Sequence, residues 1–305
     1  MNINFKPDLS VVIPVYNSSK SLVELCEKIN EQLKKTNRSH EIILVDDNST
    51  NPQTQKAIKE LLRKGLATKA YRHDLNAGQH TSLLTGIYLA RGRYIITMDD
   101  DMQHDPGYLQ DLLDKSSHDV VMADFALRKH NTFKNLTSVM KFFTERVVLN
   151  RPKDIRLSTY TVIKRDIALK MLRLAGKTYT LGSLIFKSTK DVVNTPVPHN
   201  PRKEGHSGYS LSKMFRLYRQ IFESEPHKLG LFFMKSGLSM LIIMAIIIFI
   251  FYDHIAANDY VLFPVLAVVL PGIAIITAIA GIMIRFASTA PKPFIPPAFK
   301  KINIE

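Results

Sequence analysis

Short apolar runs alternate with longer amphipathic stretches along the first 125 residues of the chain. The apolar runs are rich in β-branched residues and are bounded by polar ones, which is typical of buried strands. We expect strands over residues 9–16, 41–47, 68–73, 94–98 and 119–125. Strands that alternate with helices predict a mostly parallel sheet and therefore an α/β fold.

Three amphipathic stretches between these runs carry apolar residues at the three- and four-residue spacing of a helix. They cover residues 21–35, 51–65 and 78–92. Ser21 and Glu24 fit a capping box at the start of the first helix. Pro52 suits the first turn of the second helix, and Gly65 stands just past its end.

The C-terminal third contains two long stretches without a charged residue, 236–252 and 260–284. A helix crosses a bilayer core with about 20 apolar residues. The second stretch exceeds this length, and the first reaches it when the apolar residues before Lys235 are included. We therefore expect two transmembrane helices within residues 231–285, in preference to two buried helices of a soluble domain.

Basic residues flank both predicted spans, whereas the linker between them, residues 253–259, has no Lys or Arg. The positive-inside rule then places both ends of the chain and the large N-terminal domain in the cytoplasm. Residues 208–230 combine an apolar helical face with a basic edge, which indicates a helix on an anionic lipid surface. A helix that packs on a protein core would show the same pattern. The proline-rich segment of the tail, residues 290–301, is expected to be irregular.

The formal net charge of +14 predicts an anionic partner, such as a phosphorylated ligand or an anionic lipid surface. Nucleic acid fits less well, because the basic residues cluster beside the predicted spans and no basic stripe with interleaved aromatic residues occurs before them. Cys26 is the only cysteine, so no internal disulfide can form, and its helical context predicts a small core residue. The glycine-rich fingerprints of dinucleotide-binding and P-loop proteins are absent.

Two acidic clusters follow predicted strands: Asp46–Asp47 after the second, and Asp99–Asp101 after the fourth. Ligands of parallel sheets collect beyond the carboxyl ends of the strands. In an extended chain Asp99 and Asp101 would point to one side and Asp100 to the other. Two carboxylates on one side suit Mg²⁺, which binds one or two of them together with substrate phosphates, and Gln103 could add an oxygen. A solvated acidic turn is the alternative.

Several ordered motifs resemble one known family. The segments SVVIPVYNSSKSL, EIILVDDNST and NAGQHTSLLTGIYLARGRYIITMDDDMQHDPGYL are similar to the opening of family 2 glycosyltransferases of the GT-A fold. The closest resemblance within that family is to the polyprenyl-phosphate type, such as dolichyl-phosphate mannose synthase and bacterial undecaprenyl-phosphate sugar transferases. On this resemblance, residues 1–207 form a GT-A catalytic domain, 208–230 a juxtamembrane helix, 231–285 two spans and 286–305 a cytoplasmic tail.

The resemblance implies a role for each matching position. Asp99, Asp101 and Gln103 match the metal and diphosphate motif, and the cation would be Mg²⁺ or Mn²⁺. Asp99, Asp101 and, as a candidate base, Asp154 are the implied catalytic residues; a salt bridge to Arg151 or Arg156 would explain Asp154 equally well. The implied nucleotide-binding residues are Pro14, Tyr16, Asn17, Asp46, Asp47, Asn76, Gly78, Gln79 and Asp100. The implied phosphate- or acceptor-binding residues are Arg128, Arg165, Arg202, Lys203 and Ser207, with Arg165 structural as the alternative.

Two departures from the family pattern stand out. Gly208 occupies a position where the family usually has lysine, so Lys203 or Lys213 would have to supply that charge. Leu157–Thr159 replaces a Ser-Gly pair, which leaves the sugar open. The chain has no tryptophan, so the Q-x-x-R-W signature of processive polysaccharide synthases is absent and a single transfer is favoured.

The expected function is therefore inverting, metal-dependent transfer of one sugar from a UDP- or GDP-sugar to undecaprenyl or dolichyl phosphate. Transfer to another lipid or glycan acceptor is the first alternative. The second is a non-catalytic membrane protein that binds nucleotide or lipid. Membrane lipids are expected partners, nucleic acid is not, and self-association is left open.

Overall fold

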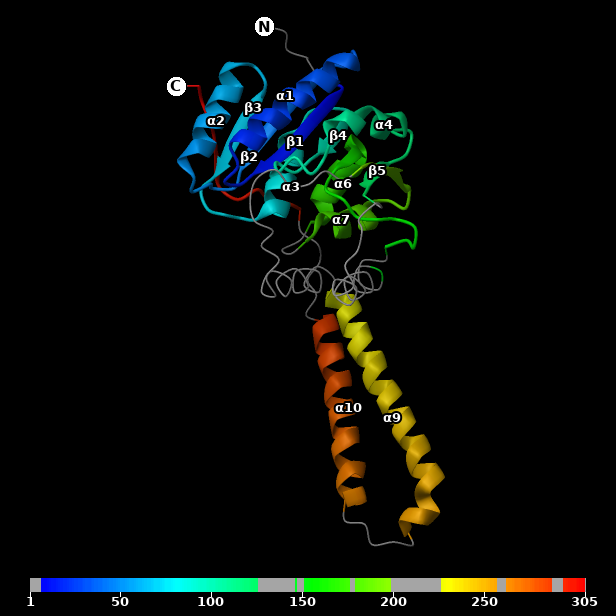
Figure 1. Cartoon of the computed structure of the whole chain (residues 1–305). Helices are drawn as coiled ribbons and strands as arrows, with labels where there is room; N and C mark the ends of the chain where they lie inside the picture. Colours follow the sequence, from blue (N-terminus) through cyan, green and yellow to red (C-terminus); the bar gives the residue numbers. More distant parts are fainter. Residues whose placement is uncertain are drawn as a thin grey trace.

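A mixed sheet with helices on both faces and a separate pair of long helices make up the described part of the chain (Figure 1). This is a computed structural model, and it describes residues 7–125, 146, 151–175, 179–198, 226–256, 262–286 and 293–304. The N-terminal residues of the predicted amphipathic segment, 208–225, lie outside the described residues.

Eight strands form one sheet in the order β7-β5-β6-β4-β1-β2-β3-β8. The strands are β1 (Leu9–Val15), β2 (His40–Asp46), β3 (Lys69–His73), β4 (Tyr94–Thr97), β5 (Val120–Asp124), β6 (Thr161–Lys164), β7 (Val192–Pro196) and β8 (Phe299–Lys301). The first five are the predicted strands, and β1 to β4 run parallel to one another. The α/β prediction is confirmed, although β6 and β8 are antiparallel to their neighbours.

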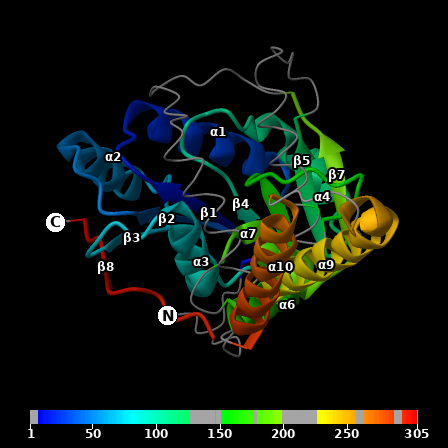
Figure 2. The same ribbon diagram turned by 90° about the horizontal axis from the view of Figure 1, so that it is seen from below.

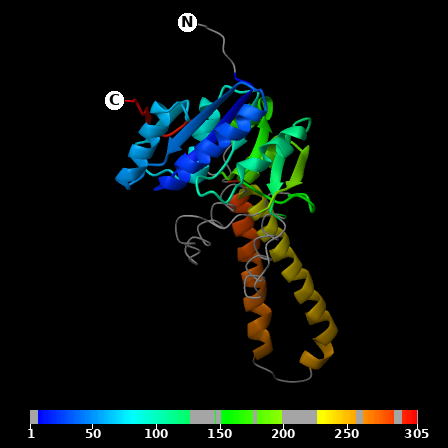
Figure 3. The same ribbon diagram turned by 45° about the horizontal axis from the view of Figure 1, so that its top comes forward.

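Helices cover both faces of the sheet, as Figure 3 shows for the blue and green ribbons. They are α1 (Lys20–Lys35), α2 (Pro52–Arg63), α3 (Gln79–Leu89), the 3₁₀ turn η1 (Pro106–Tyr108), α4 (Leu109–Asp114), α6 (Arg165–Leu174) and α7 (Leu181–Ser188). Asn51 caps α2 by accepting a hydrogen bond from the Gln53 amide, with Pro52 in the first turn as expected. The capping box predicted at Ser21 and Glu24 is wrong, because the residue before α1 is Ser19, two residues earlier, and Ser21 is buried within the first turn.

The two core layers follow from the alternation of side chains along β1. Val11 and Ile13 face the layer under α1, α2 and α4, whereas Val12 faces the layer under α3, α6 and α7. Cys26 is fully buried in the first layer, where burial raises the pKa of its thiol to about 12. Its predicted role as a core residue is confirmed.

Helices α9 (Pro226–Ala256) and α10 (Leu262–Phe286) lie side by side and extend away from the sheet (Figures 1 and 2). Small residues permit close packing: a Cβ at Gly237 would stand 2.5 Å from the Ala274 carbonyl oxygen, and one at Gly281 would stand 2.5 Å from that of Gly230. Within the described residues, no helix satisfies the combined length and apolarity required of a membrane span.

After α10 the chain returns to the sheet. The Phe294 amide donates to the Leu172 carbonyl at 2.6 Å, and the Phe294 ring is buried in the second core layer. Residues Phe299–Lys301 then pair with β3 as its antiparallel neighbour. The expectation of an irregular tail is therefore wrong for these residues, because the open edge of β3 offers backbone partners to any extended segment that reaches it.

Candidate active site

A pocket of about 490 Å³ lies where the loops after β1, β2, β3 and β4 converge. The carboxyl ends of parallel strands meet at one edge of a sheet, so residues far apart in sequence share this pocket. Its lining comprises Pro14, Val15, Tyr16, Asn17, Ser18, Ser21, Asp47, Asn76, Gly78, Gln79, Asp99, Asp100 and Asp101. All but three of these residues, Val15, Ser18 and Ser21, were predicted as site residues.

Three residues other than glycine in these loops adopt left-handed backbone conformations: Asn17 (φ 57°), Asn48 (φ 57°) and Met102 (φ 62°). Asparagine tolerates this region, whereas an unbranched apolar residue such as methionine rarely occupies it. Met102 lies in the turn closed by the Gln103 amide, which donates to the Asp101 carboxylate at 3.1 Å. Backbone strain is therefore concentrated beside the acidic cluster.

Asp99 is held by donors from two different elements. Gln79 Nε2 donates to Asp99 Oδ1 at 2.6 Å, and Thr159 Oγ1 donates to Oδ2 at 2.7 Å. A carboxylate has about four acceptor positions. Each oxygen of Asp99 therefore keeps a lone pair for a further ligand.

Asp100 contacts the loop after β1 instead. The Tyr16 amide donates to Asp100 Oδ2 at 3.1 Å, and the Ser18 hydroxyl donates to the same oxygen. Burial raises the pKa of Asp100 to about 6, an effect that the two donors oppose and the charges of Asp99 and Asp101 reinforce. The raised pKa favours the neutral form of Asp100, and that form reduces the repulsion among three adjacent carboxylates.

The predicted alternation of the three side chains does not hold. Strand β4 ends at Thr97 and the chain bends, so Asp99, Asp100 and Asp101 all line the same pocket. The alternation expected of an extended chain is lost because β4 does not continue through the acidic residues.

Asp47 fixes the loop that follows β3. Its carboxylate accepts hydrogen bonds from the Ala77 amide (2.7 Å), the Gly78 amide (2.8 Å) and His73 Nδ1 (3.2 Å). Burial acts to raise the pKa of Asp47, but these hydrogen bonds outweigh it and leave the pKa below its ordinary value. Asp47 thus stays ionised and sets the position of Gly78 and of its neighbour Gln79.

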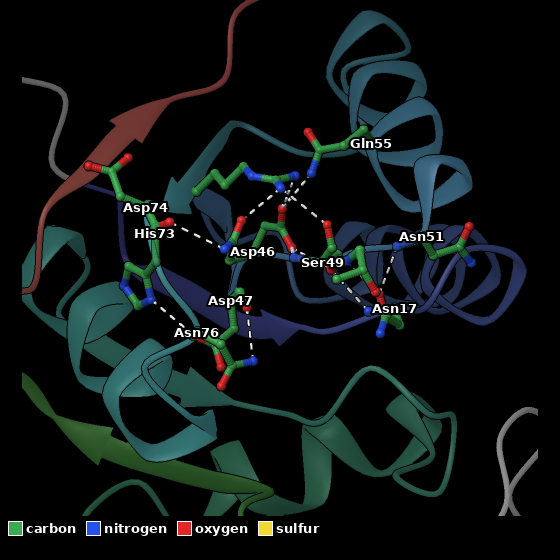
Figure 4. A network of polar contacts seen from close by, with 12 residues as sticks. Asn17, Asp46, Asp47, Ser49, Asn51, Gln55, His73, Asp74 and Asn76 are labelled. Carbon is green, nitrogen blue, oxygen red and sulfur yellow. Dashed lines mark hydrogen bonds and ion pairs between the residues drawn. The ribbon is translucent and has the colours of Figure 1, made fainter.

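Asp46 points away from the pocket into a buried polar network (Figure 4). Its carboxylate contacts Ser49, Gln55 and Arg72, with Arg72 Nη1 at 3.1 Å from Oδ2. Asn17 belongs to the same region, because its Oδ1 accepts from the Thr50 and Asn51 amides at 2.9 and 3.0 Å. These contacts join the loops after β1 and β2.

Four predicted site residues do not line the pocket: Asp46, Gln103, Asp154 and Arg165. Asp154 is exposed and does not line the pocket. Arg165 follows the end of β6 that pairs with the start of β4, opposite to the end that carries Asp99. Its guanidinium donates to the Ala90 carbonyl at 2.9 Å, which supports the structural role and not contact with phosphate at this pocket. Arg128, Arg202, Lys203 and Ser207 lie outside the described residues.

Four residues that hold the site together were not predicted from the sequence: Ser18, Arg72, His73 and Thr159. Arg72 and His73 end a strand at the same edge as the acidic clusters, so their position was a usable signal. Thr159 belongs to the segment already recognised as a departure from the family pattern. Only the folded chain shows that it reaches Asp99.

A divalent cation was predicted at Asp99 and Asp101. Among the described residues, no group of three or more His, Cys, Asp or Glu side chains is arranged to hold a metal ion. The donor set nevertheless fits a cation that is also bound by substrate phosphates, because two carboxylates face one pocket and Asp99 retains free lone pairs. Gln103 is half-buried, and its side chain does not line the pocket.

Comparison with known families assigns the chain. The model of glycosyl transferase family 2 matches residues 10–172, more than half of the sequence, and includes every residue that lines the pocket. The chain belongs to this family. It is a glycosyltransferase, and the acidic pocket lies within the matched part of the transferase.

Curated relatives are named as polyprenyl-phosphate sugar transferases. The transferase is 28% identical over 278 residues to dodecaprenyl-phosphate galacturonate synthase of Rhizobium johnstonii, covering 86% of this chain and 81% of that protein. It is 28% identical over 215 residues to undecaprenyl-phosphate 4-deoxy-4-formamido-L-arabinose transferase of Pseudomonas aeruginosa. That match covers 68% of this chain and 62% of the relative, less than two thirds of its length.

Solved structures show the fold. Glucosyl-3-phosphoglycerate synthase of Mycobacterium tuberculosis, in complex with Mn²⁺, uridine diphosphate and phosphoglyceric acid, superimposes with a TM-score of 0.55 at 14% identity. The match covers 73% of this chain and 78% of that one. The transferase therefore has a GT-A-like α/β fold.

Proposed function

We propose that the transferase moves one sugar from a nucleotide-sugar donor to a polyprenyl phosphate at the cytoplasmic face of a membrane, with inversion at the anomeric carbon. The observation that carries the proposal is the acidic pocket at the carboxyl edge of the sheet, within a chain that resembles a dodecaprenyl-phosphate sugar transferase over 86% of its length. The sugar and the nucleotide base stay open.

The proposed transfer does not require a strong base. An oxygen of the acceptor phosphate forms a bond to the anomeric carbon while the bond from that carbon to the donor diphosphate breaks, and the nucleoside diphosphate leaves with the electron pair. A phosphate monoester loses its second proton with a pKa of about 6, so the nucleophile is largely ionised at neutral pH. Attack on the face opposite the leaving group gives inversion.

The pocket itself is acidic, so it must gain positive charge before it can receive a diphosphate. Asp99 and Asp101 would hold a divalent cation, Mg²⁺ or Mn²⁺, which neutralises charge on the leaving group when bound. Gln79 and Thr159 orient Asp99, and Asp47 positions the Asn76–Gln79 loop. Arg128, Arg202, Lys203 and Ser207 stay candidates for phosphate binding on the family resemblance alone, as Asp154 does for a base.

Membrane insertion is the second part of the proposal. The predicted spans include residues outside the described set, so this part rests on the charge-free stretches 236–252 and 260–284 and on exposed apolar side chains. Ile243 on α9 and Ile276 on α10 are 57% and 68% exposed. Side chains of this kind in contact with water would be unfavourable on both helices, whereas lipid tails would cover them. Anchoring of the hairpin would keep the pocket near a lipid-borne phosphate.

The sequence left two alternative functions open, a non-catalytic membrane protein and transfer to another acceptor. The non-catalytic reading is set aside, because the family assignment and the relatives indicate a glycosyltransferase. Transfer to another lipid or glycan acceptor stays possible within the family. The names of the relatives favour polyprenyl phosphate over it.

A donor panel tests the proposal directly. Purified full-length protein in detergent is incubated with undecaprenyl phosphate, Mn²⁺ and, one at a time, labelled UDP- and GDP-sugars; diacylglycerol replaces the acceptor in a parallel series. We expect a labelled, acid-labile lipid product with one donor and only with the polyprenyl phosphate. Product from diacylglycerol alone, or none from any donor, would reject the proposed reaction.

A further inference from the structure

His104 lies beneath the acidic pocket, between two aromatic rings. Its imidazole is stacked on Phe125 with a centroid separation of 5.3 Å and on Tyr160 with one of 5.5 Å. The residue is only 7% exposed and is not part of the pocket lining. A phenylalanine would fill this stack as well, so packing alone does not account for a polar ring here.

One ring nitrogen of His104 is hydrogen-bonded to the backbone of Asp99. The Asp99 amide donates to Nδ1 at 3.2 Å, and Nε2 lies 3.8 Å from Asp99 Oδ2. Because Nδ1 accepts this hydrogen bond, the neutral ring carries its proton on Nε2, which is too far from Oδ2 for a hydrogen bond. The ring therefore contacts Asp99 through its backbone amide.

These contacts occur where the backbone has lost the support of the sheet. Strand β4 ends at Thr97, two residues before Asp99, and the bend continues to the left-handed Met102. Gln79 and Thr159 hold the Asp99 carboxylate, but neither bonds its amide. The ring of His104 is the partner of that amide.

We propose that His104 is a positioning residue for the transfer reaction: it fixes the backbone of Asp99, so that the carboxylate keeps the orientation that binds the cation and the donor diphosphate. This inference rests on the proposed function. His104 itself touches neither substrate nor cation. Loss of a partner that orients a metal ligand typically costs about 10–100-fold in metal affinity or activity.

Two substitutions separate positioning from packing. His104→Phe keeps an aromatic ring in the stack and removes the acceptor for the Asp99 amide. His104→Asn removes the ring and keeps an acceptor oxygen near the position of Nδ1. The affinity for Mn²⁺ in the absence of donor is measured by electron paramagnetic resonance. The thermal midpoint is measured by fluorescence, and the transfer rate is measured at several metal concentrations with the donor that the panel identifies.

We expect His104→Phe to keep a thermal midpoint near that of the parent, to bind Mn²⁺ about 10–100-fold more weakly and to need correspondingly more metal for half-maximal rate. His104→Asn should melt earlier and keep most of the Mn²⁺ affinity. If His104→Phe binds Mn²⁺ as tightly as the parent, the inference about His104 is wrong. Sugar transfer by the parent would still support the proposed function in that case. An inactive parent that binds no Mn²⁺ would reject the proposed function, and the inference with it.

Discussion

Asp47 and Asp46 are adjacent carboxylates with different environments. Asp46 is the last residue of β2, and its carboxylate lies in the network with Arg72 and Gln55. Asp47 is the first residue beyond the strand, and its carboxylate reaches the loop after β3. Which of two consecutive acids faces the pocket therefore depends on the residue at which the strand ends.

Asp47→Asn should lower stability most at neutral pH. The folded-state pKa of Asp47 lies below its unfolded value of about 3.9. Its contribution is therefore complete above pH 4 and is lost as the pH falls through the folded pKa. Hydrogen bonds to a charged group stabilise by about 1.5–3 kcal/mol, so the variant should melt earlier at pH 7.

The thermal midpoint of the parent should fall more steeply than that of the variant as the pH is lowered toward 3. Asp74→Asn, a change at an exposed neighbouring position, is the matched control. Parallel pH profiles of parent and Asp47→Asn would contradict the stabilising role of the ionised carboxylate.

Asp101→Asn should reduce sugar transfer with little change in stability. The substitution keeps an oxygen that can accept from the Gln103 amide but removes the charge offered to a cation. Loss of one electrostatic stabiliser of a reaction costs about 10²–10³-fold in kcat. Asp114→Asn, at an exposed position on α4 outside the pocket, controls for the loss of a carboxylate. Transfer at the parent's rate would reject the assignment of Asp101 to the cation.

Much of the pocket could be predicted from the sequence because parallel strands bring their carboxyl ends to one edge. Asp47 and Asp99 were placed together on that basis alone. The contacts of Thr159 and His104 with Asp99 could not be predicted in this way. Thr159 lies on a loop 60 residues later in the sequence, and His104 follows a bend after β4, so both contacts depend on how these segments pack in the folded chain. For Arg165 the motif match left a structural and a phosphate-binding role open, because it carries no information about which end of the sheet the residue occupies. The hydrogen bond to the Ala90 carbonyl favours the structural role.

Helix α3 shows how closely one element can approach the sheet. A Cβ at Gly86 would stand 2.2 Å from Cγ1 of Val12 on β1. Such a distance is far below van der Waals contact, so only glycine permits the present separation of α3 from β1. The same helix carries Gln79 at its first residue, which donates to Asp99. Its distance from the sheet therefore also sets the position of a pocket residue.

Gly86→Ala should destabilise the transferase by about 1–3 kcal/mol, the usual cost of overpacking. We expect an earlier thermal midpoint and, because α3 shifts, weaker donor binding. Gly272→Ala, where a Cβ meets no atom within 4 Å, is the matched helical control. The cost of Gly86→Ala should shrink in a Val12→Ala background, because the clashing methyl groups are then absent. Equal costs in both backgrounds would contradict the proposed clash.

Strand β8 could not be predicted from the sequence for a physical reason. Strand β8 is three residues long and includes Lys300 and Lys301, so it has no apolar alternation of its own. It forms because β3 has an unpaired edge, and Phe299 meets the Tyr71 ring at a centroid distance of 5.6 Å. Local pattern could not reveal a strand whose stability comes from a neighbour more than 200 residues earlier.

At the scale of the whole molecule, the chain leaves the sheet domain along α9 and returns to it along α10 (Figure 1). The chain is anchored after the hairpin by Phe294 in the second core layer and by β8 at the sheet edge. If the hairpin spans a bilayer, both of its flanks lie on one side, which agrees with the distribution of basic residues in the sequence.

Cysteine labelling tests this topology, because buried Cys26 with its raised pKa should not react in the folded protein. We expect a membrane-impermeant maleimide to label Ala257→Cys, in the linker between the two spans, on intact cells. Lys64→Cys, at an exposed position past α2, should be labelled only after permeabilisation. Labelling of Lys64→Cys on intact cells, or protection of Ala257→Cys there, would reject the proposed orientation.

The pairing of β8 with β3 also constrains the order of events during synthesis. Residues Lys69–His73 emerge from the ribosome more than 200 residues before Phe299–Lys301. At about 5–20 residues per second, the β3 edge stays open for roughly 10–45 s in each nascent chain. During that interval it is a template for unintended strand pairing between neighbouring chains on a polysome. Strand β8 therefore covers the edge of β3 only after the α9–α10 hairpin has been synthesised. We expect the nascent chain to need chaperones most just before β8 emerges.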